Sequence, residues 1–322
     1  MNIPDFRSAL AEPFARFLGY KRALNRKYRT EAGALRLFDA YLCEHASSGV
    51  GSIPSTLIED FLKSRPRTRP RSYNHLLGVL HRFFAWAVLQ QLSAQNPVTA
   101  QRRRDSGSRI PFIFDLSQAR RLLQVAHMLP DNPRAPCRAL TYETVFAMLY
   151  GLGLRVGEVA RLKLRDVDFV QDLLFIRDTK FSKSRWVPFG PNLGERLRRY
   201  IDQRYGQTRD PEWPLFAFFP GQGIRETTFS QVFQKLVTQL KIDIPPGVSR
   251  PCLHTLRHSF AVGTLLRWYR EGIDPNRRLM HLATFLGHVD PTSTSVYLTV
   301  TEDLLREADQ RFRTVAPKVG AP

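Results

Sequence analysis

A polar stretch near residue 100 separates two parts of the chain that differ in their pattern of apolar residues. Residues 93–111, SAQNPVTAQRRRDSGSRIP, lack apolar periodicity and contain an Asn-Pro pair, three successive arginines and a Ser-Gly-Ser sequence. Such a composition is typical of an exposed linker. Because 322 residues are enough for two ordinary domains, we expect a first domain over residues 1–92, a linker over 93–111 and a second domain over 112–322.

The apolar residues before the linker recur at the three- and four-residue steps of an amphipathic helix. One such stripe runs through residues 73–88 and another through residues 31–43. Pro54 and Pro70 stand where helices could begin, because proline is tolerated in the first turn of a helix. The first domain is therefore predicted to be a small helical bundle.

The second part mixes helical and strand patterns. Helices are expected near residues 115–128, 138–150, 227–240, 255–270, 276–286 and 302–313. Two short apolar runs, 173–176 and 186–189, flank a polar turn, which predicts a β-hairpin. The predicted fold class is therefore mainly α with a small β-sheet, an α+β fold in which a helical N-terminal domain precedes a larger mixed domain.

The chain is strongly basic, with 48 Lys and Arg against 29 Asp and Glu and a formal net charge of +19. Residues 1–110 hold 18 basic and 8 acidic residues, so both parts carry an excess. This favours a polyanionic partner such as nucleic acid. The runs 63–71, KSRPRTRPR, and 102–104, RRR, are either solvated or in contact with phosphates, and we favour phosphate contact.

Other classes of protein fit the sequence less well. No apolar run reaches the roughly 18–20 residues that span a bilayer, and the first residues lack the charged start and apolar core of a secretory signal. Three scattered cysteines, Cys43, Cys137 and Cys252, include no CxxC pair, which argues against a zinc site built from cysteines and against a disulfide framework. We therefore expect a cytoplasmic protein with no membrane partner, no metal and no cofactor.

Two patches in the second part carry basic residues that are suited to phosphate chemistry. Arg155 follows the Gly-broken apolar stretch LYGLGL, where it either binds an anion or forms a structural salt bridge with Glu158. Lys180 lies in the turn between the two expected strands. A lysine there is either solvated or able to enter a DNA groove and donate a proton.

Two further patches carry histidine, arginine and tyrosine. In the run HTLRH, His254 and Arg257 are three residues apart and share one face of an expected helix. A guanidinium beside an imidazole suits a phosphate better than a metal, since no third ligand lies at zinc spacing. His288 ends the run LGH, and Tyr297 follows nine residues later. By itself a tyrosine is usually a packed aromatic residue, but it can also be a nucleophile.

These patches together, in this order, resemble the catalytic set of the tyrosine recombinases, also called the phage-integrase family. The resemblance covers roughly residues 10–315, and the ordered set is far more specific than any one motif. It implies six catalytic residues: Arg155, Lys180, His254, Arg257, His288 and Tyr297. The stretch between the second arginine and the second histidine is longer than is usual in the family, with an added segment near residues 268–278.

The resemblance implies a site-specific recombinase that acts in integration, excision, transposition or resolution. The tyrosine would cut one DNA strand, leaving a 3′-phosphotyrosine and a 5′-hydroxyl, and a partner strand would then rejoin. The arginines would neutralise the phosphate, the lysine would protonate the leaving oxygen, and His254 and His288 would bind the phosphate and handle the proton of the tyrosine. Glu158 and His258 are assigned to support.

The implied partners are a double-stranded DNA recombination site and other copies of the chain, as a tetramer on synapsed DNA, or a related recombinase subunit. Residues 302–312 predict an amphipathic helix that either packs on its own domain or, as the resemblance implies, docks on a neighbouring subunit. On DNA the protein would be associated with the nucleoid. Two alternatives stay open, a type IB topoisomerase that relaxes DNA and a DNA-binding regulator without catalysis.

Overall fold

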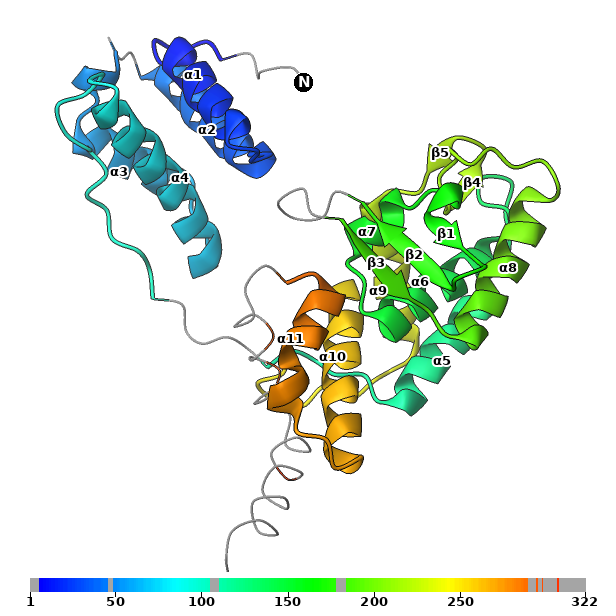
Figure 1. Ribbon diagram of the computed structural model, residues 1–322. Helices are drawn as coiled ribbons and strands as arrows, with labels where there is room; N and C mark the ends of the chain where they lie inside the picture. Colours follow the sequence, from blue (N-terminus) through cyan, green and yellow to red (C-terminus); the bar gives the residue numbers. More distant parts are fainter. Residues whose placement is uncertain are drawn as a thin grey trace, which may run out of the picture. The chain divides into compact units, whose positions relative to one another are not determined.

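The computed structural model describes residues 6–45, 49–104, 110–177 and 184–288, together with Thr294, Tyr297 and Arg306. The chain divides into two compact units, Met1–Ser108 and Arg109–Pro322, each built around an apolar core of its own (Figure 1). The described part is mostly helical with two small sheets, so the predicted fold class is confirmed. Within the described residues, no helix has both the length and the apolar character that a membrane crossing requires.

The described residues of the first unit form four α-helices, α1 (Ala11–Ala23), α2 (Arg29–Glu44), α3 (Ser55–Ser64) and α4 (Pro70–Leu89), with a 3-10 turn at Val50–Ser52. The helices predicted from the two apolar stripes are α2 and α4, and the two prolines mark the starts of α3 and α4. Aromatic rings fill the core between them; the ring centroids of Phe14 and Phe83, for example, are 4.6 Å apart. Such contacts contribute beyond the apolar area that they bury.

The chain that leaves α4 is held against the first unit as far as Arg103. Asn74 Nδ2 donates to the Arg103 carbonyl at 2.8 Å, and Asn74 Oδ1 accepts from the Arg103 backbone N–H at 2.8 Å. The Arg103 guanidinium lies 3.9 Å from the centre of the Tyr73 ring and donates to the Arg67 carbonyl at 2.8 Å. The first unit therefore extends beyond residue 92, because an amide side chain pairs with the backbone as a second peptide group would.

The second unit contains seven described α-helices: α5 (Leu116–His127), α6 (Arg138–Leu152), α7 (Val156–Arg161), α8 (Pro191–Tyr205), α9 (Glu226–Gln239), α10 (Leu253–Arg270) and α11 (Pro275–Leu286). Helix α6 is buried along most of its length, and α5, α8 and α10 pack around it. A helix that is apolar on nearly every side has to be central in this way. The expected helices near 115–128, 138–150, 227–240, 255–270 and 276–286 are confirmed within two residues at each end.

A three-stranded antiparallel sheet contains the predicted hairpin. Its order is β1 (Val167–Asp168), β2 (Leu173–Ile176) and β3 (Arg185–Pro188), and Ile176 pairs with Arg185 across the hairpin. The strand β3 begins one residue earlier than predicted, which brings Arg185 into the sheet. A 3-10 turn, Leu164–Asp166, leads into β1, and a second hairpin is formed by β4 (Ala217–Phe219) and β5 (Gln222–Gly223).

The last predicted elements fall at the limit of the description. Helix α10 ends at Arg270, and α11 begins at Pro275 after Asp274, whose side chain accepts from the backbone N–H of Asn276 at 3.0 Å. The added segment near 268–278 is thus the end of one helix, a short turn and the start of the next. Apart from Arg306, the helix predicted at 302–313 lies outside the described residues.

Candidate active site

Gly153 and Gly287 end the two helices whose last carbonyls lie at the site. Gly153 follows α6 with φ +59° and Gly287 follows α11 with φ +68°, a left-handed conformation that favours glycine. Space is also restricted, because a Cβ atom at Gly153 would lie 2.5 Å from the Phe260 ring, and one at Gly287 would lie 2.7 Å from the Arg185 guanidinium. Gly153 in GLGLR and Gly287 in LGH are therefore required by backbone conformation and by packing.

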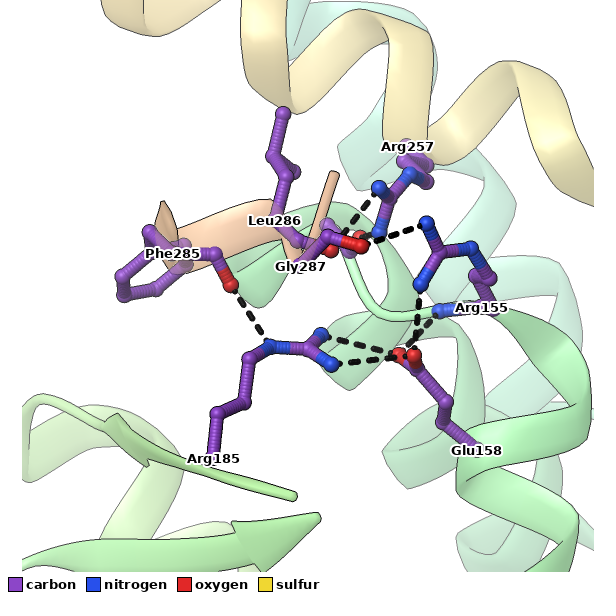
Figure 2. Close-up of polar contacts among 8 residues, drawn as sticks. Arg155, Glu158, Arg185, Arg257, Phe285, Leu286 and Gly287 are labelled. Atoms are coloured by element: carbon purple, nitrogen blue, oxygen red, sulfur yellow. Dashed lines mark hydrogen bonds and ion pairs between the residues drawn. The ribbon is translucent and has the colours of Figure 1, made fainter. Parts of the chain in front are cut away.

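The last turn of α11 presents carbonyl oxygens that the helix itself does not use. The backbone N–H groups of His288 and Gly287 donate to the Ala283 and Thr284 carbonyls, each at 2.9 Å, which closes the helix in the usual way. The next three carbonyls each accept from a different arginine at 2.9 Å: Phe285 from Arg185, Leu286 from Arg257, and Gly287 from Arg155 (Figure 2). The negative end of the helix dipole therefore holds three guanidinium groups in place.

Arg257 joins the ends of α6 and α11. Its side chain is almost completely buried, and besides the Leu286 carbonyl it donates to the Gly153 carbonyl at 2.7 Å. Burial, followed by the positive charge of Arg155, lowers the pKa of Arg257 to about 10. The guanidinium therefore stays charged at neutral pH, in an orientation that two backbone oxygens define.

Arg155 forms the salt bridge with Glu158 that the sequence suggested as one possibility. Glu158 also pairs with a second arginine, Arg185. The Nη1 atom of Arg155 lies 2.8 Å from Glu158 Oε1, and the Arg155 backbone N–H donates to Oε2 at 3.0 Å. The two carboxylate oxygens of Glu158 also accept hydrogen bonds from the two terminal nitrogens of Arg185, at 3.0 and 2.9 Å. Burial raises the pKa of Glu158, but the hydrogen bonds and charges of Arg185 and Arg155 outweigh it and lower that pKa to about 2.

Tyr297 lies beside the imidazoles of His258 and His288, and His254 lies against His258. Its hydroxyl is 2.9 Å from His258 Nδ1, and the His254 ring meets the His258 ring edge-on with centroids 4.5 Å apart. The His288 ring is nearly parallel to the Tyr297 ring at 6.3 Å, and its Nδ1 lies 2.6 Å from the hydroxyl of Thr294. His258, which the sequence analysis assigned to support, is thus the imidazole in contact with the tyrosine hydroxyl.

The titration of these groups follows from burial and from the arginines. Burial raises the pKa of Tyr297, while Arg257 and Arg155 act in the opposite direction. Burial lowers the pKa of both His258 and His288 to about 4, with further lowering by nearby histidine and arginine charges. Around neutral pH the site therefore combines a protonated phenol, neutral imidazoles that can accept a proton, and charged guanidinium groups.

The structure brings together most of the residues that were predicted for catalysis. Arg155, Arg257 and His288 meet at the end of α11, and Tyr297 and His254 both lie against His258. Lys180 lies outside the described residues. Within the described ranges, no three His, Cys, Asp or Glu side chains are grouped so that they could hold a metal ion.

Arg185 is a residue of this site that was not predicted from the sequence. The signal for it was the alternation of the strand, because residues two apart on a strand share a face and Val187 is fully buried. An arginine at position 185 must therefore point toward the core side of the sheet, where it needs partners.

Residues 113–303, more than half of the chain, match the phage integrase family. The chain is 32% identical over 312 residues to y4rB of Sinorhizobium fredii, which is described as an integrase/recombinase, with 95% of this chain and 96% of the relative covered. It is 29% identical over 238 residues to the tyrosine recombinase XerD of Ralstonia nicotianae, with 72% of this chain and 70% of the relative covered.

Solved structures of integrases share the fold. The Tn1549 transposon integrase in complex with a circular intermediate DNA aligns with a TM-score of 0.65 at 19% identity, covering 95% of this chain and 100% of the other. A lambda integrase dimer bound to a core site aligns with a TM-score of 0.63 at 18% identity, covering 91% and 78%. The resemblance seen in the catalytic motifs is thereby confirmed, and the chain belongs to the phage integrase family of tyrosine recombinases.

Proposed function

We propose that the chain is a site-specific DNA recombinase in which Tyr297 becomes joined to the 3′-phosphate of a cut strand. Membership of the family makes the chain an enzyme that breaks and rejoins DNA strands. The assignment of the residues is supported above all by one observation. The Tyr297 hydroxyl is hydrogen-bonded to a neutral imidazole, in the same site as two arginines that are fixed on adjacent carbonyls of α11.

The arginines bind the phosphate that reacts. Arg155 keeps about a quarter of its side chain exposed, at 28%, so that it can contact DNA while its other contacts hold it in place. In the transition state the nonbridging oxygens gather negative charge, and pre-oriented donors stabilise that charge without having to rearrange. Removal of one such donor typically lowers the rate by a factor on the order of 10²–10³.

The tyrosine supplies the nucleophile. Its oxygen attacks phosphorus, the bond between phosphorus and the 5′-oxygen breaks, and the phenolic proton passes to His258, which is neutral above about pH 4. Lys180 protonates the leaving 5′-oxygen. Because the phosphotyrosine retains the energy of the broken bond, a 5′-hydroxyl from a partner strand can attack it and rejoin the DNA without ATP.

We assign the proton of the tyrosine to His258, supported by the contact between their side chains, whereas the sequence favoured His254 and His288. His254 instead contacts the ring of His258, and His288 bonds to Thr294. These two histidines then serve as hydrogen-bond donors to the phosphate. His258 is the residue that accepts the proton.

The partner is double-stranded DNA that contains a recombination site. Solved relatives of the same fold are bound to such DNA, among them the Tn1549 integrase and XerH on a palindromic difH substrate. We infer a tetramer of this chain, or of this chain with a related recombinase, on two synapsed sites, with residues 302–312 bridging neighbouring subunits. The enzyme would act in the cytoplasm, on the nucleoid. Neither a topoisomerase nor a non-catalytic regulator finds support among the relatives.

A plasmid assay tests the function. Binding sites are first selected from random DNA, and two copies are placed in inverted orientation on one supercoiled plasmid. We expect inversion of the segment between them, read by restriction mapping and by sequencing of the junctions. Relaxed topoisomers without inverted product would instead indicate a topoisomerase, and unchanged plasmid that is nevertheless bound would indicate a regulator.

A further inference from the structure

We propose that Arg185 is a positioning residue that fixes the β2–β3 hairpin, and with it Lys180, against the arginines that bind the phosphate. The inference rests on the proposed role of Lys180 as the proton donor. It adds a residue that touches neither phosphate nor tyrosine and acts only through the placement of another group.

The contacts of Arg185 join three elements. Its Nε donates to the Phe285 carbonyl at the end of α11 at 2.9 Å, and its two terminal nitrogens donate to the two oxygens of Glu158 in α7 at 3.0 and 2.9 Å (Figure 2). Only 12% of its side chain is exposed. A two-pronged guanidinium–carboxylate contact fixes both distance and direction, so β3 is held rigidly on α7 and α11.

The position of Arg185 in the hairpin makes this contact relevant to Lys180. Arg185 is the first residue of β3 and pairs with Ile176, the buried last residue of β2. Ile176 and Arg185 therefore stand at the two ends of the stretch of sequence that contains Lys180. Lys180 is five residues before Arg185, and five residues of fully extended chain span at most roughly 17 Å. The position at which Arg185 is fixed therefore limits how far the Lys180 side chain can lie from the site.

A shared carboxylate relates the hairpin to the phosphate site. Glu158 accepts from Arg155, which binds phosphate in the proposed function, and from Arg185 in the hairpin. The same two arginines also bond to carbonyls two residues apart at the end of α11. The hairpin is therefore held by the same carboxylate and the same helix end as Arg155, while Arg155 keeps its own bonds to Glu158 and to the Gly287 carbonyl. We infer that this arrangement keeps the proton donor in register with the phosphate.

Lysine cannot reproduce these contacts. It has a single nitrogen in place of the planar fork of arginine, so it cannot reach both Glu158 oxygens and the Phe285 carbonyl together. Arg185→Lys retains the positive charge beside a buried carboxylate and should fold, whereas Arg185→Gln removes the charge as well. Arg196→Gln is a matched control, because Arg196 also pairs with a largely buried carboxylate, that of Glu143, in the same unit.

The test compares cleavage of two DNA substrates by the full-length protein. One carries the normal 5′-bridging oxygen at the cut, and the other carries sulfur there, which leaves without a proton. With oxygen we expect Lys180→Ala to be slower by about 10²–10⁴-fold, the usual size of general-acid catalysis. Both Arg185 variants should be slower by about 10–10²-fold, the usual cost of misplacing a catalytic group. With sulfur all three should come within about threefold of wild type, because no proton has to be delivered.

Thermal unfolding and DNA affinity are measured for each variant, and Arg196→Gln should match wild type on both substrates. If Lys180→Ala is rescued by sulfur and the Arg185 variants are slowed equally on both substrates, then Arg185 supports the fold or Arg155, and the inference is wrong. If sulfur does not rescue Lys180→Ala, the role of the lysine itself is wrong, and the inference built on it is overturned as well. If Arg185→Gln does not fold, Arg185→Lys decides between these outcomes.

Discussion

The carboxylate of Glu158 determines how much positive charge the site offers to DNA. Three guanidinium groups converge on the end of α11, and like charges at such distances repel. Glu158 cancels one of them, and the helix end contributes roughly half a negative charge more. An excess of roughly one to two positive charges is left for the phosphate, and it does not depend on a proton that can be lost near neutral pH.

The shifted pKa values of Glu158, His258 and His288 predict how the stability of the protein depends on pH. The pKa of His258 and His288 is about 4 in the folded protein, below the ordinary value of about 6.5. The unfolded chain therefore takes up protons first, and stability is lost as the pH falls from about 6.5 to about 4. Glu158, with a folded pKa of about 2, contributes stability above its ordinary pKa of about 4.3, which is lost as the pH falls toward 2.

Glu158→Gln separates these two contributions. Chemical denaturation over pH 2–8 should show a variant that is less stable than wild type at neutral pH, because two guanidinium groups lose their counter-charge. Below about pH 4.3 its free energy of unfolding should change less with pH than that of wild type. The part of the curve between about pH 4 and 6.5, which comes from the histidines, should be retained. An unchanged slope below pH 4.3 would contradict the low pKa of Glu158.

The ends of two helices carry the geometry of the site. Helices α6 and α11 both end in a left-handed glycine, and carbonyls at their ends orient Arg257 and Arg155, the two arginines proposed to bind phosphate. Because the acceptors are backbone atoms, a side-chain substitution cannot remove them, but a change in the path of the backbone can.

Gly153→Ala tests this dependence. The substitution forces alanine into a left-handed conformation, at a cost of about 1–2 kcal/mol, and places its Cβ 2.5 Å from the Phe260 ring. We expect a lower melting temperature and impaired cleavage, since the Gly153 carbonyl holds Arg257. Gly151→Ala is the control within α6, where a Cβ meets nothing within 4 Å. It should stabilise by about 0.5–1 kcal/mol. Equal effects at the two positions would show that the turn at Gly153 is not constrained.

At the scale of elements, the apolar stripes of the sequence were enough to predict α2, α4 and most helices of the second unit. They did not single out α8, whose sequence PNLGERLRRYIDQRY spreads its apolar residues among many charges. The strand β1 has two residues, too few to show any alternation. Even where helices were predicted, their ends were less certain than their centres, because end residues lack part of the hydrogen-bond pattern.

The site was predictable in its residues and not in their contacts. The ordered motifs singled out Arg155, Arg257 and Tyr297, which the structure places in one site. Their acceptors on α11 are carbonyl oxygens, which every residue possesses, so no sequence pattern marks them. Arg185 was overlooked for the same reason. Its partners are the Phe285 carbonyl and the carboxylate of Glu158. For Glu158 the sequence had already suggested Arg155 as the partner.

For the molecule as a whole, positive charge is distributed over both units, and both are expected to contact DNA. In the first unit, Arg65, Arg69, Arg71 and Arg103 are all exposed, but Arg103 also stacks on Tyr73 and donates to the Arg67 carbonyl. Their roles should therefore differ, with Arg65, Arg69 and Arg71 contacting phosphates and Arg103 holding the chain on α4.

The salt dependence of DNA binding distinguishes these roles. Each phosphate contact contributes about −0.9 to the slope of log affinity against log salt concentration. Replacing Arg65, Arg69 and Arg71 together by glutamine should make the slope shallower by up to about 2.7. Arg103→Gln should mainly lower the melting temperature of the first unit. A triple variant with the slope of wild type would show that this run does not contact DNA.

The central claim is that Tyr297 becomes covalently joined to DNA, and trapping the adduct on a nicked recombination site tests it most directly. The adduct is resolved on a denaturing gel, and the modified residue is located by mass spectrometry. We predict an adduct at the 3′ end of the cut strand on Tyr297, formed equally well in the presence of EDTA. Tyr297→Phe should bind the site with the affinity of wild type and form no adduct, while Tyr269→Phe should still form it. An adduct on another residue, or one that persists in Tyr297→Phe, would contradict the account.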